Sequence, residues 1–169
     1  MTEYTKYLED TVWCNDRSIY QLNSWDKDYI GSDGLYFESY IKNDYSPYVS
    51  DLSCPNQADS FTVSSENGNG KLTYPVALLT GDEATLGGLG WYGNSSSSYL
   101  SNNEAWWILT PGYIANVSYM LYISSVPNLS AIHPDFSSYG VRPAIVLAHN
   151  LLVAKGEGTS ENPYELVLE

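Results

Sequence analysis

The chain has 169 residues, of which 20 are acidic and 7 basic, giving a formal net charge of −13. Hydrophobic residues make up 43% of the sequence and aromatic residues 14%, which excludes a disordered polymer and suffices for the core of about one domain. The acidity argues against nucleic acid and anionic membrane surfaces as partners, because both require a basic footprint. The apolar runs are far shorter than the about 20 residues that span a bilayer, so we expect no membrane insertion of this domain.

The opening MTEYTKYLED is acidic and lacks the basic-then-apolar pattern of a signal peptide. We interpret residues 1–169 as a single domain that forms the C-terminal part of a longer exported protein.

The first half of the sequence predicts short elements separated by turns. A helical turn is expected at Glu3–Asp10, a strand at Thr11–Cys14, a short helix within Gly34–Asn43, a strand at Phe61–Val63 and an extended run at Leu72–Leu79. Thr80 and Glu83 have the spacing of a capping box, which predicts a helix that begins after Thr80 and ends at Gly87-Gly88. The segment Trp91–Asn103 is rich in Ser and Asn and is expected to be a loop.

The second half predicts a mainly antiparallel sheet. Extended structure is expected at Trp106–Leu109, and Val117–Ile123 should pair with Asn128–Ile132. Val141–Leu147 is expected to be a third strand, with Pro143 indicating an edge or a strand start, and Tyr164–Leu168 a final one after the turn at Gly156–Thr159. The predicted fold class is therefore α+β, with short helices in the first half and the sheet in the second.

Two cysteines, Cys14 and Cys54, allow either one disulfide or two buried thiols. A disulfide would close a loop of roughly forty residues and stabilise the fold by about 3–4 kcal/mol.

Residues 112–139 differ in composition from the rest of the chain. Tyr, Ser and Asn occupy 12 of these 28 positions, the only formal charge is Asp135, and no Lys or Arg occurs between Lys71 and Arg142. This composition is typical of binding loops, because Tyr offers a large amphipathic contact area while Ser and Asn adapt their hydrogen bonds. We interpret residues 112–139 as a ligand-binding surface carried by a scaffold.

Several phrases resemble a family of bacterial and phage proteins with the C-type lectin fold. The phrases are LEDTVWCNDRS, CPNQADSFTV, NGKLTYPVALLTGDEATLGG, WWILTP, YGVRPAIVL and GEGTSENPYELVL. Such domains commonly lie at the C-terminus of cell-surface, secreted or phage-tail proteins. Some members are variable proteins of diversity-generating retroelements, in which adenine-directed mutation changes ligand contacts and leaves the scaffold unchanged.

The resemblance implies a division of residues between scaffold and ligand contacts. Residues 112–139 contain no Lys, Glu, Gln or Trp and one Met, in keeping with adenine-directed mutation, although a fixed adhesin with a neutral binding face would show the same depletion. The implied scaffold positions are Trp107, Leu109, Pro111, Val117, Met120, Ile123, Gly140, Val141, Arg142 and Pro143. The implied contact positions are Tyr113, Ile114, Asn116, Tyr119, Leu121, Tyr122, Ser130, Ile132, His133, Asp135, Phe136, Ser137, Ser138 and Tyr139. Because Tyr119 and Tyr122 would lie on opposite faces of one strand, at least one should face the core.

The sequence contains no complete metal-binding or catalytic signature. Val126-Pro127-Asn128 matches a calcium-lectin signature only in its last two residues, and Asn102-Asn103-Glu104 lacks a second carboxylate, so no metal or other cofactor is expected. The fold is distantly similar to that of formylglycine-generating enzymes, which use cysteine and copper chemistry, but His133 and His149 stand apart from any cysteine or acid motif. His149 is expected in a solvated turn. Arg142 is expected to form a structural ion pair with an early carboxylate such as Asp16.

The leading hypothesis is a non-enzymatic domain that binds a protein or carbohydrate ligand on a cell surface, as a diversified variable protein. The alternatives are a fixed carbohydrate- or protein-binding adhesin module and, behind it, an enzyme of the formylglycine-generating type.

Overall fold

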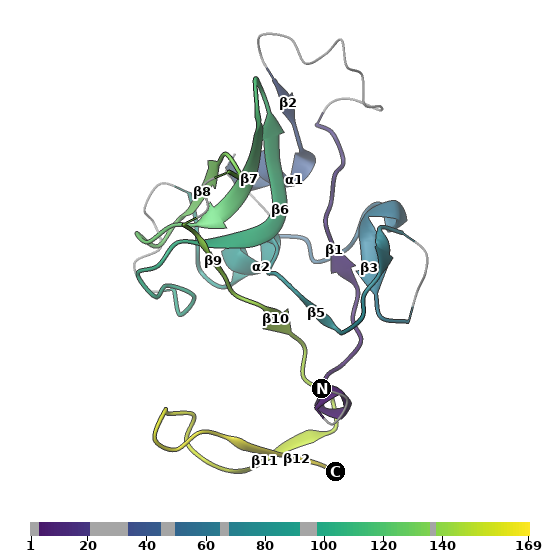
Figure 1. The fold of residues 1–169 in the computed structure, drawn as a ribbon, viewed down its shortest axis with the longest axis vertical. Helices are drawn as coiled ribbons and strands as arrows, with labels where there is room; N and C mark the ends of the chain where they lie inside the picture. The colour runs from purple at the N-terminus through teal and green to yellow at the C-terminus, as the bar shows by residue number, and fades with distance from the viewer. Residues whose placement is uncertain (1–3, 21–33, 45–49, 65–67, 92–97, 136–137) are drawn as a thin grey trace.

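The computed structural model describes residues 4–20, 34–44, 50–64, 68–91, 98–135 and 138–169. Over these residues the protein is mostly β, with two short α-helices early in the chain and an antiparallel sheet in the second half (Figure 1). This confirms the predicted division of the chain at that level. No helix in the described ranges has the length and apolarity needed to cross a membrane.

The first half contains short elements. They are the 3₁₀-helix η1 (Thr5–Tyr7), β1 (Trp13–Cys14), β2 (Leu35–Tyr36), α1 (Glu38–Asp44), the 3₁₀-helix η3 (Gln57–Asp59), β3 (Ser60–Thr62), β4 (Gly70–Lys71), β5 (Val76–Ala77) and α2 (Gly81–Leu86). Strand β3 pairs with β1 on one side, antiparallel, and with β4 on the other, parallel. The helix expected within residues 34–43 begins only at Glu38, because Leu35 and Tyr36 pair with the main sheet instead.

The main sheet consists of β2, β6 (Trp106–Ile114), β7 (Ser118–Ile123) and β8 (Leu129–Ile132) in that order, with β9 (Gly140–Val141) parallel to β6. The predicted pairing of the β7 and β8 segments is confirmed, with Tyr122 opposite Ser130. Strand β6 is longer than predicted and its register shifts on both sides of Pro111. A proline lacks the N–H that a ladder needs, which accounts for an irregularity at this point.

The expectation of one strand at Val141–Leu147 is wrong. The segment is split into β9, which pairs with β6, and β10 (Ala144–Ile145), which pairs with β5. Pro143 lies between them and cannot donate to a ladder. The chain then forms a hairpin of β11 (Leu151–Lys155) and β12 (Glu165–Leu168), of which only the turn and the second strand were predicted.

The core lies between the main sheet and α2. Trp106, Ile108, Leu121, Ile123 and Leu129 from the sheet pack with Ala84, Leu89 and Leu100. Helix α2 has the predicted capping box, in which the Thr80 hydroxyl accepts from the Glu83 N–H and the Glu83 carboxylate accepts from the Thr80 N–H. Buried Thr110 on β6 accepts from the Gly81 N–H at 2.7 Å, which fixes the start of α2 against the sheet.

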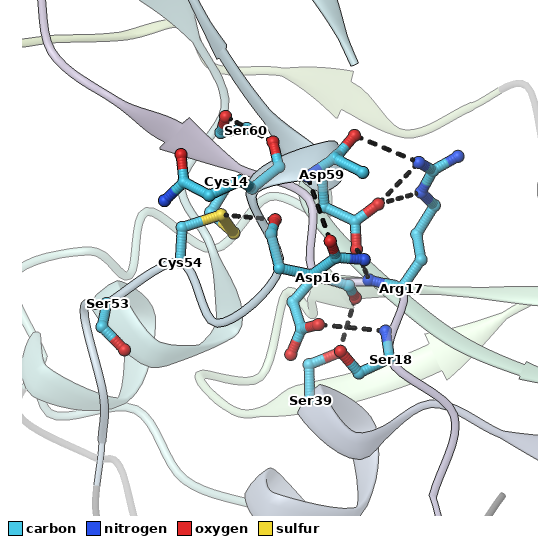
Figure 2. Close-up of a disulfide and its surroundings, with 12 residues drawn as sticks. Cys14, Asp16, Arg17, Ser18, Ser39, Ser53, Cys54, Asp59 and Ser60 are labelled. Atoms are coloured by element: carbon cyan, nitrogen blue, oxygen red, sulfur yellow. Dashed lines mark hydrogen bonds and ion pairs between the residues drawn. A yellow bond between two sulfur atoms is a disulfide. The ribbon is translucent and has the colours of Figure 1, made fainter. Parts of the chain in front are cut away.

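Cys14 and Cys54 form a disulfide, with their Cα atoms 5.5 Å apart, which settles the alternative between bonded and free cysteines. Figure 2 shows a second link beside it, where the buried Asp59 carboxylate accepts from the Arg17 Nε at 2.6 Å and from the Arg17 N–H at 2.9 Å. A buried carboxylate is tolerated only when paired in this way. The two links hold the β1 segment to the η3–β3 segment.

Candidate ligand-binding surface

The two faces of β7 have different environments. Side chains alternate along a strand, so Tyr119, Leu121 and Ile123 point to the side of the sheet that α2 covers, whereas Met120 and Tyr122 point to the opposite side. We call these the helix side and the outer face. The faces divide the predicted contact residues into two groups.

Leu121 was predicted to contact ligand, and the structure places it in the core with 0% exposure. That assignment is wrong, because a ligand cannot reach a side chain beneath α2. Ile114 is half-buried at the end of β6, where it pairs with Leu35. The alternation of β7 already indicated that Leu121 and Tyr122 could not both face a ligand.

The helix side carries an aromatic cluster that continues the core. The Tyr113 and Tyr119 rings stack with centroids 4.2 Å apart, and Tyr113 lies 5.3 Å from both Tyr36 and Tyr40. Tyr40 in turn meets Trp91 edge-on at 5.4 Å. Burial raises the pKa of the Tyr113 phenol, with smaller contributions from Tyr119 and Tyr36. The expectation that Tyr119 or Tyr122 faces the core is confirmed for Tyr119.

The outer face carries a row of side chains that crosses four strands. Val141 on β9 lies beside Trp107 on β6, Trp107 opposite Tyr122 on β7, and Tyr122 opposite Ser130 on β8. We call these four residues the outer row. None is formally charged, and Val141 is 65% exposed while the other three are half-buried.

Tyr139 packs against the centre of the outer row. Its ring centroid lies 5.2 Å from that of Trp107 and 4.7 Å from that of Tyr122. The pKa of the Tyr139 phenol is raised, first by burial and then by a hydrogen bond with Tyr122, so the Tyr139 phenol is neutral at physiological pH. Met120 and Ile132 form the neighbouring pair on the same face. The outer face is thus aromatic, apolar and uncharged at its centre.

Trp107, Met120 and Val141 were assigned to the scaffold by resemblance, yet they lie on the outer face beside Tyr122. The sequence already indicated that one of the two adjacent tryptophans, Trp106 and Trp107, faces away from the core. Adjacent strand residues point to opposite faces, so of the pair Trp106 and Trp107 one must face away from the core. Trp106 is the buried member, with 2% exposure.

The remaining predicted contacts are spread over other parts of the sheet. Asn116 is exposed in the turn between β6 and β7, and Ser138 is exposed before β9. His133 follows β8 on the helix side, where it meets Tyr119 edge-on at 6.4 Å and hydrogen-bonds the exposed Asp135. Phe136 and Ser137 lie outside the described residues.

Arg142 has partners other than the expected ion pair with Asp16. Its Nη1 donates to the Leu100 carbonyl at 2.8 Å, and its guanidinium lies 4.7 Å from the centre of the Trp106 ring. Asp16 instead accepts from the Ser18 N–H. The predicted ion pair with Asp16 is therefore wrong, and the Arg142 side chain instead makes a hydrogen bond to a carbonyl and a cation–π contact.

An acidic cavity of about 190 Å³ lies elsewhere, beside the disulfide and the start of α2. Of its carboxylates, Asp16, Asp51, Asp82 and Glu83 each accept from a backbone N–H, so they serve local turns and the helix cap. Across the described ranges, no three His, Cys, Asp or Glu side chains are grouped so as to hold a metal ion.

Two other sequence expectations concern single residues. His149 lies in a turn with its side chain 87% exposed, as predicted, and its Nδ1 is 3.2 Å from the Glu9 carboxylate. Asn128 accepts from the Ser124 hydroxyl at 2.8 Å, so it supports the turn between β7 and β8.

Comparison with protein-family models, curated proteins and solved structures gives no match for this chain.

Proposed function

We propose that this protein is a non-enzymatic ligand-binding domain with a C-type lectin fold, and that it is a diversified variable protein of a bacterial or phage surface system. The outer face of the main sheet is its ligand-binding surface. The contact set that we assign to it is Trp107, Met120, Tyr122, Ser130, Ile132, Tyr139 and Val141.

The observation that carries the proposal is the packing of Tyr139 against Trp107 and Tyr122 on a half-exposed, uncharged sheet face. Aromatic side chains dominate binding hot spots, because each removes a large area from water at a low cost in conformational entropy. The backbone beneath them is held by pairing on both sides of β6 and β7. A rigid sheet presenting a few aromatic side chains suits a binding surface.

The proposed diversification is supported by the position of the residues that adenine-directed mutation could exchange, because they share the outer face. Tyr122, Ser130, Ile132 and Tyr139 belong to residues 112–139 and to the set that adenine-directed mutation of Asn-type codons reaches. They share the outer face, so exchanging them leaves the packing of Leu121 and Ile123 beneath α2 intact. A fixed adhesin would use the same surface and differ only in how its gene varies.

Other features support binding over the formylglycine-generating alternative. Both cysteines form the disulfide, so no thiol is free for cysteine chemistry. The disulfide also favours an oxidising environment, in keeping with a cell-surface, secreted or phage-tail location.

The binding surface is tested by challenging the full chain with a panel of neutral oligosaccharides and of purified ectodomains of bacterial and host surface proteins. For any ligand found, Tyr122→Ala and Tyr139→Ala should each reduce affinity at least about tenfold, the loss expected when a hot-spot aromatic side chain is truncated. Tyr99→Ala is the matched control, since Tyr99 is 81% exposed and lies outside this face. Binding that survives both outer-face variants, with melting temperatures unchanged, would contradict the assignment.

A further inference from the structure

Residues 50–55 form a surface segment without regular secondary structure, which we call the strap. Four of its residues line the acidic cavity of about 190 Å³, together with β1 and the start of α2. Cys54 lies within the strap, and its disulfide to Cys14 attaches this wall of the cavity to β1. Figure 2 shows Ser53 and Cys54 on the side of the disulfide away from Arg17.

Strand β1 is attached to β3 by contacts that do not involve the disulfide. The antiparallel ladder pairs Trp13 with Phe61. Just after β1, the Asp59 carbonyl accepts from the Asn15 N–H at 3.1 Å, and the Asp59 carboxylate accepts from the Arg17 Nε at 2.6 Å. Asp59 is 1% exposed, and hydrogen bonds away from water are the stronger ones. Breaking the disulfide removes none of these contacts directly.

The strap depends more heavily on the disulfide. The Asp51 N–H donates to the Asp82 carboxylate at 3.0 Å and the Ser53 N–H donates to the Asp51 carboxylate at 2.8 Å, and both hydrogen bonds lie at the surface. Leu52 is 65% exposed and therefore contributes little apolar packing. Solvent-exposed hydrogen bonds and few buried apolar contacts are typical of segments that open locally. The disulfide therefore restrains the strap more than it restrains β1.

We propose that the Cys14–Cys54 disulfide is a redox-sensitive latch, whose reduction releases the strap and opens the acidic cavity while β1 stays paired with β3. Both cysteines are half-buried and most strap residues are exposed, so a small dithiol can reach the bond. The dithiol supplies two electrons and two protons. One of its thiolates attacks a sulfur of the disulfide, its second thiol resolves the mixed disulfide, and both cysteines become thiols while the dithiol becomes a cyclic disulfide.

Opening the latch changes which side chains meet solvent. Trp13 and Thr110 line the same cavity as the strap and are 3% and 4% exposed while the strap is closed. The strap stays closed in an oxidising environment, and transfer to a reducing one exposes these residues. The latch shares no residue with the proposed ligand surface, so it does not rest on that proposal.

Limited chymotrypsin digestion of the full chain, with and without dithiothreitol, tests the release of the strap. Cleavage after Leu52 should be at least about tenfold faster in the reduced protein, because a protease cuts a segment that can leave the surface. Cleavage after Leu121, which is 0% exposed, is the internal reference and should stay slow. A variant that combines Cys14→Ser with Cys54→Ser is the control. It should be cleaved at the fast rate whether or not dithiothreitol is present.

NMR spectra of the reduced wild type test whether the opening is local, and they need no refolding because the protein is folded before reduction. The Arg17 amide resonance and the Overhauser contacts between Trp13 and Phe61 should persist, whereas the Asp51 and Ser53 amides should move to random-coil positions. Equal cleavage after Leu52 in the oxidised and reduced protein overturns the proposal, because other contacts would then hold the strap. Loss of the Trp13–Phe61 contacts, or cleavage that accelerates equally at the internal reference, also overturns it, because the disulfide would then hold the whole fold.

Discussion

At the scale of single residues, Arg17 and Arg142 show how two similar side chains are used differently. Arg17 neutralises the buried Asp59 carboxylate, whereas Arg142 lies over the Trp106 ring and donates to the Leu100 carbonyl. The sequence predicted an ion pair between Arg142 and an early carboxylate such as Asp16, and the structure shows other partners for both residues. Partners of this sort are set by three-dimensional packing, because Leu100 and Arg142 are 42 residues apart.

Replacing Arg142 by Ala should lower the melting temperature and leave ligand affinity unchanged. The variant loses a hydrogen bond to a carbonyl and a cation–π contact, which together contribute about 1–3 kcal/mol. Thermal unfolding and a binding assay on the same preparation measure the two effects. Normal stability with lost binding would instead make Arg142 a ligand contact.

Asp10 provides a pH-dependent link between the N-terminal segment and the end of β3. Its carboxylate accepts from the Val63 N–H at 2.9 Å and the Ser64 N–H at 3.0 Å, and these hydrogen bonds lower the pKa of Asp10 below its usual 3.8. Hydrogen bonds to the charged form favour that form. A carboxylate whose pKa falls on folding stabilises the protein above its unfolded pKa and loses that effect as pH drops through the folded value.

Asp10→Asn should therefore melt at a lower temperature than the wild type at neutral pH, and the difference should shrink below about pH 4. Melting temperatures measured from neutral to acid pH test this, with Glu104→Gln in an exposed turn as the control. A difference that stays constant across the whole range would show that the Asp10 charge is not responsible.

At the scale of elements, local signals predicted most of what the structure contains. The Thr80–Glu83 spacing correctly placed the start of α2, and residue alternation with a turn between placed β7 and β8. Boundaries that depend on distant pairing were missed. Leu35–Tyr36 forms a strand because it pairs with β6. Leu151–Lys155 forms a strand because it pairs with β12, which follows later in the chain.

Thr80→Ala should destabilise the protein by about 1 kcal/mol, because it removes the acceptor that satisfies the Glu83 N–H at the start of α2. In a protein of this size the melting temperature should fall by about 2–4 °C. Ser138→Ala, at an exposed position, is the control and should leave melting unchanged. A Thr80→Ala variant as stable as the wild type would mean that water replaces the cap at no cost.

At the scale of the whole molecule, the candidate site could be predicted in part. Tyr122, Ser130, Ile132 and Tyr139 lie within residues 112–139, which we interpret from their composition as a binding surface, and the structure brings these four to one face. The composition does not indicate which tyrosines lie on that face and which lie on the helix side, where Tyr113 and Tyr119 stack on each other. It also could not include Trp107 and Val141, which lie outside residues 112–139. Trp107 joins the face through its pairing with Tyr122 on β7, and Val141 joins it through the parallel pairing of β9 with β6.

We propose that the outer face varies between natural copies of this gene while the scaffold beneath it stays fixed. Sequencing this gene across a natural population measures this directly. We predict amino-acid changes concentrated at Tyr122, Ser130, Ile132 and Tyr139 through Asn-type codons, with Leu121, Ile123 and Leu129 invariant. Changes scattered over the whole chain, or a residue 112–139 segment as constant as the rest, would contradict it.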